Sequence, residues 1–327
     1  MYGYQIFHEA LMKTLIQNVR TKQNAHAYIF EGEPGVGKLP AVRLFAASLV
    51  CENTNAAPCG SCPACIGAKA ETNPDIRYID TGDKKSIGVN QIREIITDAY
   101  VRPFESRKKV YVISEGDALT EEAQNAFLKV LEEPPQYTVF VILVSKASML
   151  LQTIHSRCAV IRFPPLDRQT MLSYIEETYP DANREFLLRY AGGIPGNVDN
   201  IMGQEDFWVL RSEACKKLTA LLSAHTISAY AVAAFLEENK EQADLILDFW
   251  QSQMRDILFI QSGARDLVIN IDLAEDLKLI AGRLSDADAI AVTEQLLTVR
   301  NMLRQYVNLH AAAMYLALSV KEQIHSH

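Results

Sequence analysis

The chain of 327 residues is long enough for two or three domains that each bury a core. Its net charge of −8 excludes a general electrostatic attraction to DNA or to an anionic membrane, so any contact with nucleic acid must be local or made by a partner. No apolar run approaches the roughly 18 residues of a membrane span, and the N-terminal segment lacks the apolar block of a signal peptide. These features predict a cytoplasmic protein with reduced cysteines.

Apolar residues at helical spacing predict a first helix over residues 7–20. Short apolar strands then alternate with helices, which indicates a right-handed, doubly wound parallel sheet with a ligand at the carboxyl ends of its strands. The five expected strands cover residues 26–30, 76–80, 110–113, 138–144 and 158–163. The helices between them cover residues 39–50, 89–101 and 120–131, with a short one that reaches Arg157. The predicted fold class of this part is α/β.

The stretch EGEPGVGKL, directly after the first strand, has the spacing of a phosphate-binding P-loop. Its glycines, Gly32, Gly35 and Gly37, would let backbone N–H groups approach phosphate oxygens, while Lys38 supplies a positive charge. Leu39 stands where a P-loop carries the Ser or Thr hydroxyl that ligates magnesium. The spacing therefore predicts a degenerate loop, built for phosphate but poorly built for hydrolysis. Whether it binds ATP or ADP stays open, and a plain glycine turn before a helix is the alternative.

Four of the six cysteines lie within residues 51–65, in the spacing C-x7-C-x2-C-x2-C. These are Cys51, Cys59, Cys62 and Cys65. In a reduced chain this cluster predicts a structural zinc site with four thiolate ligands. An iron–sulfur cluster is one rival, but Lys69 occupies the position of the fourth ferredoxin cysteine, and cysteines that bind no metal are the other. Cys158 and Cys215 lie far from the cluster in sequence and are expected to be core thiols.

No strand pattern returns after Pro164 and Pro165. A small three-helix unit is expected next, with helices over residues 167–178, 184–190 and 196–202. The remainder is predicted to be helical over residues 206–223, 227–238, 241–262, 272–283 and 286–319. This tail is either an independent bundle or an oligomerisation surface.

The run EAQNAFLKVLEEPP at residues 122–135 lies between the four-cysteine insert and the triplet Ser156-Arg157-Cys158. In these motifs the chain resembles the bacterial DNA polymerase III clamp loader, a family of AAA+ proteins, over about residues 20–200. The resemblance implies a hetero-pentamer with tau/gamma ATPase subunits and a delta subunit. Through that complex the chain would act on the sliding clamp and on primer-template DNA, with no membrane partner.

The resemblance also implies three domains. Residues 1–165 would form an AAA+ P-loop core with a five-stranded parallel sheet and the zinc module at residues 51–65. Residues 166–204 would form a small helical lid, and residues 205–327 an all-α collar that joins the ring.

Three positions depart from the hydrolysing members of this family. Leu39 lacks the metal-binding hydroxyl, and Ser114-Glu115 replaces the Asp-Glu pair that holds magnesium and polarises water. Gly196 stands where the active relative carries a phosphate-sensing arginine. The resemblance therefore implies a subunit that does not hydrolyse ATP, because three parts of a phosphoryl-transfer site are missing. An ATP-hydrolysing subunit of the tau/gamma type is the alternative, and a small-molecule P-loop kinase fits the cysteine insert and helical tail poorly.

In the family that the chain resembles, the arginine of the Ser-Arg-Cys triplet reaches the γ-phosphate of ATP on a neighbouring subunit. Arg157 matches this arginine. A planar, permanently charged guanidinium suits this arginine-finger role. Without the family motifs, an arginine before a strand would be interpreted as a solvated charge or an internal ion pair. Lys38 is expected either to bind phosphate or to neutralise a helix–sheet corner, and Glu115 and Asp117 are expected to be structural.

Overall fold

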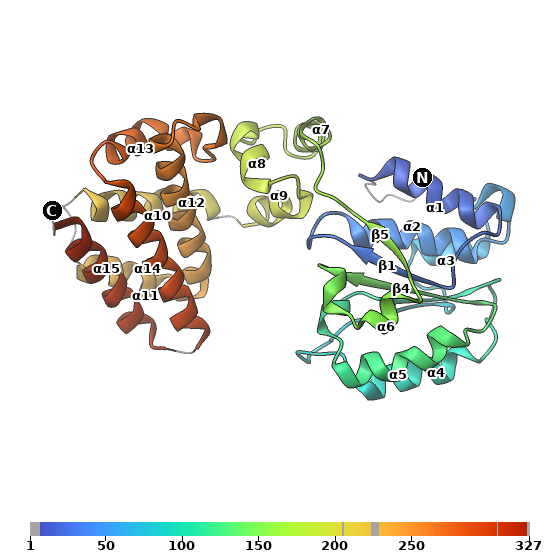
Figure 1. Ribbon diagram of the computed structural model, residues 1–327. Helices are drawn as coiled ribbons and strands as arrows, with labels where there is room; N and C mark the ends of the chain where they lie inside the picture. The colour runs from blue at the N-terminus through green and yellow to red at the C-terminus, as the bar shows by residue number, and fades with distance from the viewer. Residues whose placement is uncertain (1–6, 205, 224–228, 306, 326–327) are drawn as a thin grey trace. The chain divides into compact units, whose positions relative to one another are not determined.

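The computed structural model describes residues 7–204, 206–223, 229–305 and 307–325. The described chain divides into two compact units. The first runs to Tyr179 and also takes in Ala191–Asn197. The second comprises Pro180–Tyr190 and the chain from Val198 onward. The first unit is an α/β structure and the second is helical, as Figure 1 shows.

Five parallel strands form the sheet of the first unit, in the order β2-β3-β4-β1-β5. They are β1 (Ala27–Glu31), β2 (Ile76–Ile79), β3 (Lys109–Ile113), β4 (Thr138–Val144) and β5 (Ala159–Arg162). The predicted five-stranded parallel sheet is thereby confirmed. β1 lies between β4 and β5, so its carboxyl end, where the P-loop begins, has a neighbouring strand on each side.

Helices cover both faces of this sheet (Figure 1). One face carries α1 (Glu9–Arg20), α2 (Lys38–Val50) and α3 (Pro63–Lys69), and the other carries α4 (Val89–Ala99), α5 (Glu121–Glu132) and α6 (Gln152–His155). Successive side chains of a strand point to opposite faces. Val110 and Val112 therefore pack in one core, and Tyr111 and Ile113 in the other. Burial on both faces explains why β4 is an unbroken apolar run after Thr138.

The range expected to form the lid, residues 166–204, contributes to both units. Its helices are α7 (Arg168–Thr178), α8 (Arg184–Ala191) and α9 (Pro195–Met202). α7 lies in the first unit, whereas α8 and α9 each contain residues of both. The division into three domains therefore stays a prediction.

The second unit continues with α10 (Phe207–Leu222), α11 (Ala229–Glu238), α12 (Ala243–Gln261), α13 (Ala274–Ala281), α14 (Asp286–Arg304) and α15 (Leu309–His325). The single helix expected over residues 286–319 is wrong, because α14 and α15 are separate. The side chain of Asn308 accepts a hydrogen bond from the amide of Ala311 at 3.1 Å, which starts a new helix. α15 then packs against α14 and α11 and buries Leu316 and Val320.

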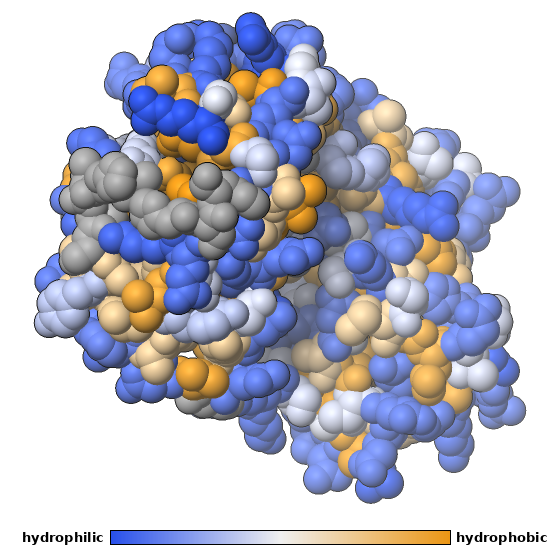
Figure 2. All heavy atoms as spheres, turned by 60° about the vertical axis from the view of Figure 1, so that its left-hand side comes forward, coloured by the Kyte–Doolittle hydropathy of each residue, from blue (hydrophilic) through white to orange (hydrophobic). Residues whose placement is uncertain are grey.

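Within the described ranges, no helix has the length and apolar character needed to cross a membrane. On the face drawn in Figure 2, hydrophilic side chains are interspersed with smaller apolar patches. Scattered apolar side chains of this kind are normal on a folded protein.

Candidate functional site

The P-loop joins the carboxyl end of β1 to the start of α2. Gly35 and Gly37 have φ angles of 81° and 102°, in the left-handed region that favours glycine. A Cβ atom at Gly32 would lie 2.4 Å from the carbonyl oxygen of Phe163, which belongs to the chain just after β5. The backbone therefore requires glycine at each of these positions, for conformation at two and for space at the third.

Lys38, the first residue of α2, is held by its own loop. Its ammonium donates hydrogen bonds to the carbonyl oxygens of Gly32 and, at 3.0 Å, of Glu33. Burial lowers the pKa of Lys38, while the charges of Asp117 and Glu33 act to raise it. The lysine is thus near the acidic end of β3, as in a nucleotide site, and two of its three N–H donors are directed at carbonyl oxygens of its own loop.

Three further groups pack directly on this loop. The amide of Gly196 donates to the carbonyl oxygen of Gly35 at 3.0 Å, and a Cβ at Gly196 would lie only 2.6 Å from the Gly35 Cα. His8 Nε2 lies 3.1 Å from the Val36 carbonyl oxygen, and the Phe7 ring lies against Gly37. The contacts of Phe7 and His8 were not expected, because no local pattern links the start of the chain to the loop.

The acids that follow β3 bind backbone amides. Glu115 accepts a hydrogen bond from the Thr81 amide at 3.0 Å, and this partner lowers the pKa of Glu115. Asp117 accepts from the amide of Ser145 through both carboxylate oxygens, at 2.8 and 3.1 Å. Leu39 carries no group that can bind a metal, and Ser114, which follows β3, has no carboxylate.

The four cysteines of the insert converge. All four sulfur atoms lie within 4.8 Å of one another. The backbone of the insert directs N–H groups at these sulfurs, from Cys59 to Cys51, from Cys62 to Cys59 and from Cys65 to Cys62, each at 3.4 Å. Sulfurs around a tetrahedral zinc with Zn–S bonds of ~2.3 Å would lie ~3.8 Å apart. The arrangement therefore fits a metal ion after a small contraction.

The surroundings of these sulfurs differ. Burial raises the pKa of Cys51 to about 12, whereas hydrogen bonds from the amide and hydroxyl of Ser61 lower the pKa of Cys59 to about 6. N–H donors favour the thiolate, which is the form that ligates metals. Cys158 and Cys215 lie outside the cluster, and burial raises the pKa of each to about 12, as expected for core thiols.

Arg157 lies between α6 and β5, with a third of its side chain exposed. One guanidinium nitrogen forms an ion pair with Glu132, the last residue of α5, at 2.7 Å. The other donates to the carbonyl oxygen of Thr153 at 2.9 Å and to the hydroxyl of Ser156 at 3.0 Å. The guanidinium is thus fixed at the surface by contacts on its own chain.

Comparison with known proteins gives the family. Residues 7–167 match the family model described as DNA polymerase III, delta subunit, and residues 205–315 match the one described as DNA polymerase III, delta subunit, C terminal. The chain is 30% identical over 319 residues to DNA polymerase III subunit delta' of Bacillus subtilis (strain 168), with 95% of each chain covered. It is 30% identical over 169 residues to subunit gamma/tau of Mycoplasma pneumoniae, which covers 52% of this chain and 24% of that protein.

Among solved structures, a gamma subunit-related protein of Thermotoga maritima is similar with a TM-score of 0.48 and 17% identity, over 96% of this chain and 99% of that one.

The parallel sheet, the glycine-rich loop and the matched ranges define an α/β P-loop protein of the DNA polymerase III delta class. More narrowly, the chain belongs to the family of DNA polymerase III delta' subunits. Its similarity to a delta' subunit spans nearly all of both chains, whereas its similarity to gamma/tau covers about a quarter of that longer protein.

Proposed function

We propose that this chain is a subunit of the DNA polymerase III clamp loader that does not hydrolyse ATP itself. It would join tau/gamma ATPase subunits and a delta subunit in a hetero-pentamer, and would offer Arg157 to the ATP of one neighbour. The complex would open the sliding clamp and place it on primer-template DNA. Membership in the delta' family supports this assignment.

One observation carries the non-hydrolysing part of the proposal. The P-loop makes contacts within its own chain, because Lys38 donates to two carbonyl oxygens of the loop and Gly196 packs on Gly35. A hydrolysing site needs magnesium and a cation at the γ-phosphate. Leu39 and Gly196 lack the groups that would supply them.

We also propose that Cys51, Cys59, Cys62 and Cys65 hold a structural zinc ion. When bound, zinc would cross-link the insert, and four sulfur ligands leave no open position for catalysis. The N–H donors aimed at the sulfurs would keep the ligands oriented and favour their thiolate form.

The place of Arg157 at the surface supports the proposed role. An arginine that reaches a neighbour's γ-phosphate stabilises the charge of the transition state and is worth ~10³–10⁵ in rate. The ion pair with Glu132 holds the guanidinium in the free chain. A half-exposed pair of this kind contributes only ~0–1 kcal/mol to stability, so its exchange for a phosphate is energetically easy.

The test is to reconstitute the complex with Arg157→Ala, Arg157→Lys and the matched control Glu132→Ala. We expect Arg157→Ala to assemble normally and to lower hydrolysis at one interface by ~10³ or more, so that total ATPase falls in part and clamp loading falls further. Arg157→Lys should behave nearly the same, because an ammonium cannot reproduce the fork of donors. Glu132→Ala removes the same ion pair but keeps the guanidinium, and should retain both activities. Normal ATPase and loading with Arg157→Ala would exclude the finger role.

The gamma/tau similarity favours a second candidate, an ATP-hydrolysing subunit. Nucleotide binding and turnover by the isolated chain distinguish the ATP-hydrolysing subunit from the non-hydrolysing one.

A further inference from the structure

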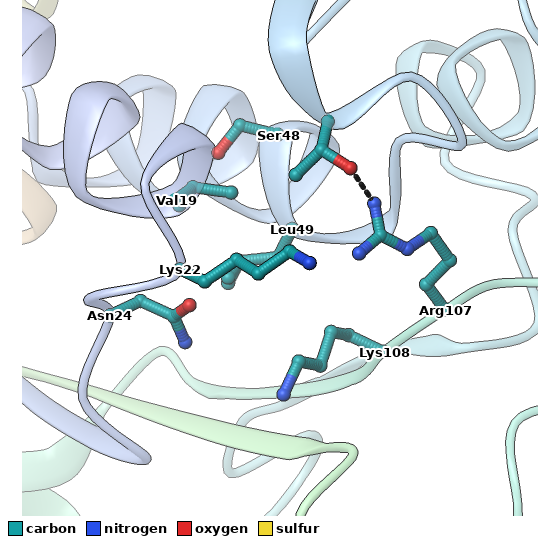
Figure 3. A pocket seen from close by; sticks show the side chains of 8 residues that line it. Val19, Lys22, Asn24, Ser48, Leu49, Arg107 and Lys108 are labelled. Atoms are coloured by element: carbon teal, nitrogen blue, oxygen red, sulfur yellow. Dashed lines mark hydrogen bonds between the residues drawn. The ribbon is translucent and has the colours of Figure 1, made fainter.

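A pocket of about 300 Å³ opens at the edge of the sheet opposite the P-loop, where the parallel strands begin. Its walls come from the last turns of α1 and α2, the segments that precede β1 and β3, and the loop that follows Cys51. The polar groups that line it are Lys22, Asn24, Ser48, Thr54, Arg107 and Lys108. Figure 3 shows Lys22 and Arg107 extending toward each other from opposite sides.

The pocket carries an uncompensated positive charge. No aspartate or glutamate lines it, and within the described ranges none of its three cations forms an ion pair with a carboxylate. The carboxyl-terminal ends of α1 and α2 supply partial negative charge, but each amounts to only about half an elementary charge. Three cations against two helix ends leave a net charge of about +2.

Two of the three cations have hydrogen-bond partners, and Lys22 and Arg107 are exposed to solvent. Arg107 donates a hydrogen bond from Nη1 to the hydroxyl of Thr54, and Lys108 donates to the carbonyl oxygen of Gln136. Lys22 adopts a φ of 60°, a left-handed conformation that is uncommon for lysine. Burial lowers the pKa of Lys108, and the charge of Arg107 lowers it further. An anion bound between these like charges would lower the electrostatic repulsion among them.

We propose that this pocket binds a phosphate group. A phosphate monoester carries a charge of about −1.5 to −2 at pH 7, which matches the uncompensated charge of the pocket. The guanidinium and the two ammonium groups have more N–H donors than their contacts within the chain use, and such donors suit tetrahedrally placed phosphate oxygens. The phosphate group belongs either to a nucleic-acid backbone or to a free phosphoanion. The chain's overall negative charge disfavours nonspecific binding of either, so binding should be local to this pocket.

The test uses the full chain with two probes, inorganic phosphate and a labelled single-stranded oligothymidylate of about 12 nucleotides. The variant Lys22→Glu with Arg107→Glu reverses two charges at the pocket. The control Lys84→Glu with Lys85→Glu makes the same change in net charge at two exposed lysines that follow β2, at the other edge of the sheet. Lys22→Gln is a milder variant that keeps the test valid if the double reversal unfolds the chain.

We expect the wild type and the control to bind at least one probe, and the pocket variant to bind it at least tenfold more weakly, with an intermediate loss for Lys22→Gln. If oligonucleotide binds more tightly and phosphate competes with it, the ligand is backbone phosphate. The slope of the logarithm of the binding constant against the logarithm of salt concentration should then become less negative by about 0.7 for each lost phosphate contact. If only inorganic phosphate binds, the ligand is a free phosphoanion. Failure of the wild type to bind either probe at low salt would overturn the proposal. Equal binding by the pocket variants and the control would do the same.

Discussion

Gly196 and Gly35 meet backbone to backbone at the P-loop. The Gly196 amide donates to the Gly35 carbonyl oxygen at 3.0 Å, and no side chain separates the two segments. This close approach explains in steric terms why position 196 holds a glycine. An arginine at the same place would need the segment that carries Gly196 to move away from the loop.

Gly196→Ala should therefore destabilise the first unit. The new Cβ would lie 2.6 Å from the Gly35 Cα. A backbone atom cannot relieve this clash by a change of rotamer, as a side chain could. Overpacking of this kind costs ~1–3 kcal/mol, and each kcal/mol lowers the melting temperature of a unit of this size by roughly 2–4 °C. Gly88→Ala is the matched control, because a Cβ there meets nothing within 4 Å. Thermal unfolding of the two variants gives the comparison, and equal melting temperatures would mean that the contact is not tight.

Glu31, the last residue of β1, makes stability depend on pH. The amide of Ala147 holds the pKa of Glu31 below its ordinary value of 4.5, with help from Arg162. The carboxylate therefore contributes stability that is complete above the ordinary value and is lost as the pH falls through the lower, folded-state value. Glu31→Gln does not titrate. In urea unfolding, the difference in unfolding free energy between the wild type and Glu31→Gln should shrink as the pH falls from about 6 to about 3. A constant difference would contradict this assignment.

At the scale of elements, the cysteine insert is a small core of its own. Cys51, Ala57 and Cys65 are buried together, apart from the two cores that flank the sheet. Arg20 at the end of α1 ties this insert to the unit through a hydrogen bond to the Ala57 carbonyl oxygen at 2.9 Å. The insert should therefore respond to metal loss without unfolding the sheet.

Cys59→Ser should release the metal and loosen the insert alone. Metal analysis under reducing conditions should find about one zinc per chain in the wild type and in the control Cys158→Ser, and little in Cys59→Ser. Metal binding by such sites is worth ~10–16 kcal/mol in small peptides, so its loss should expose residues 51–65 to protease. The thermal transition of the sheet should persist. Iron in place of zinc, or no metal in the wild type, would refute the zinc assignment.

At the scale of the whole molecule, the two ends of the parallel strands differ. The carboxyl ends carry the P-loop, whose lysine donates to carbonyl oxygens of the loop. The amino ends carry Arg157, just before β5, and the basic pocket beside β1 and β3. We infer that the chain's contacts with phosphate groups are made at the amino ends, on other molecules, rather than in its own loop.

The isolated chain should accordingly show no saturable heat when titrated with ATP and magnesium, and should turn over ATP more slowly than about 0.1 s⁻¹, against ~1–10³ s⁻¹ for typical enzymes. The variant Leu39→Thr with Ser114→Asp restores both magnesium-side groups and should recover metal-dependent nucleotide binding, though little turnover without a partner's arginine. Each single variant serves as a control that restores only one group. Turnover by the wild type at or above that rate would favour the ATP-hydrolysing alternative.

Much of the fold followed from local patterns in the chain. The apolar run that follows Thr138 predicts the buried strand β4. Apolar residues at helical spacing predict the helices, because a helix that packs on a sheet buries one side. The P-loop and the cysteine cluster were also predictable, since their ligands lie within a few residues of each other. The break between α14 and α15 was missed because a cap at Asn308 is a weak local signal beside a long helical pattern.

Contacts between distant residues were decided only by the tertiary structure. Three such arrangements join segments that are 25 or more residues apart in the sequence. They are the ion pair of Arg157 with Glu132, the packing of Gly196 on Gly35, and the shared pocket of Lys22 and Arg107. Spacing along a chain carries no information about such pairs, because they depend on the order of strands and on how helices cover the sheet. The absence of a metal-binding hydroxyl at Leu39 could be read from the sequence, but the contacts of Lys38 and Gly196 with the loop and the basic pocket at the opposite end of the strands could not.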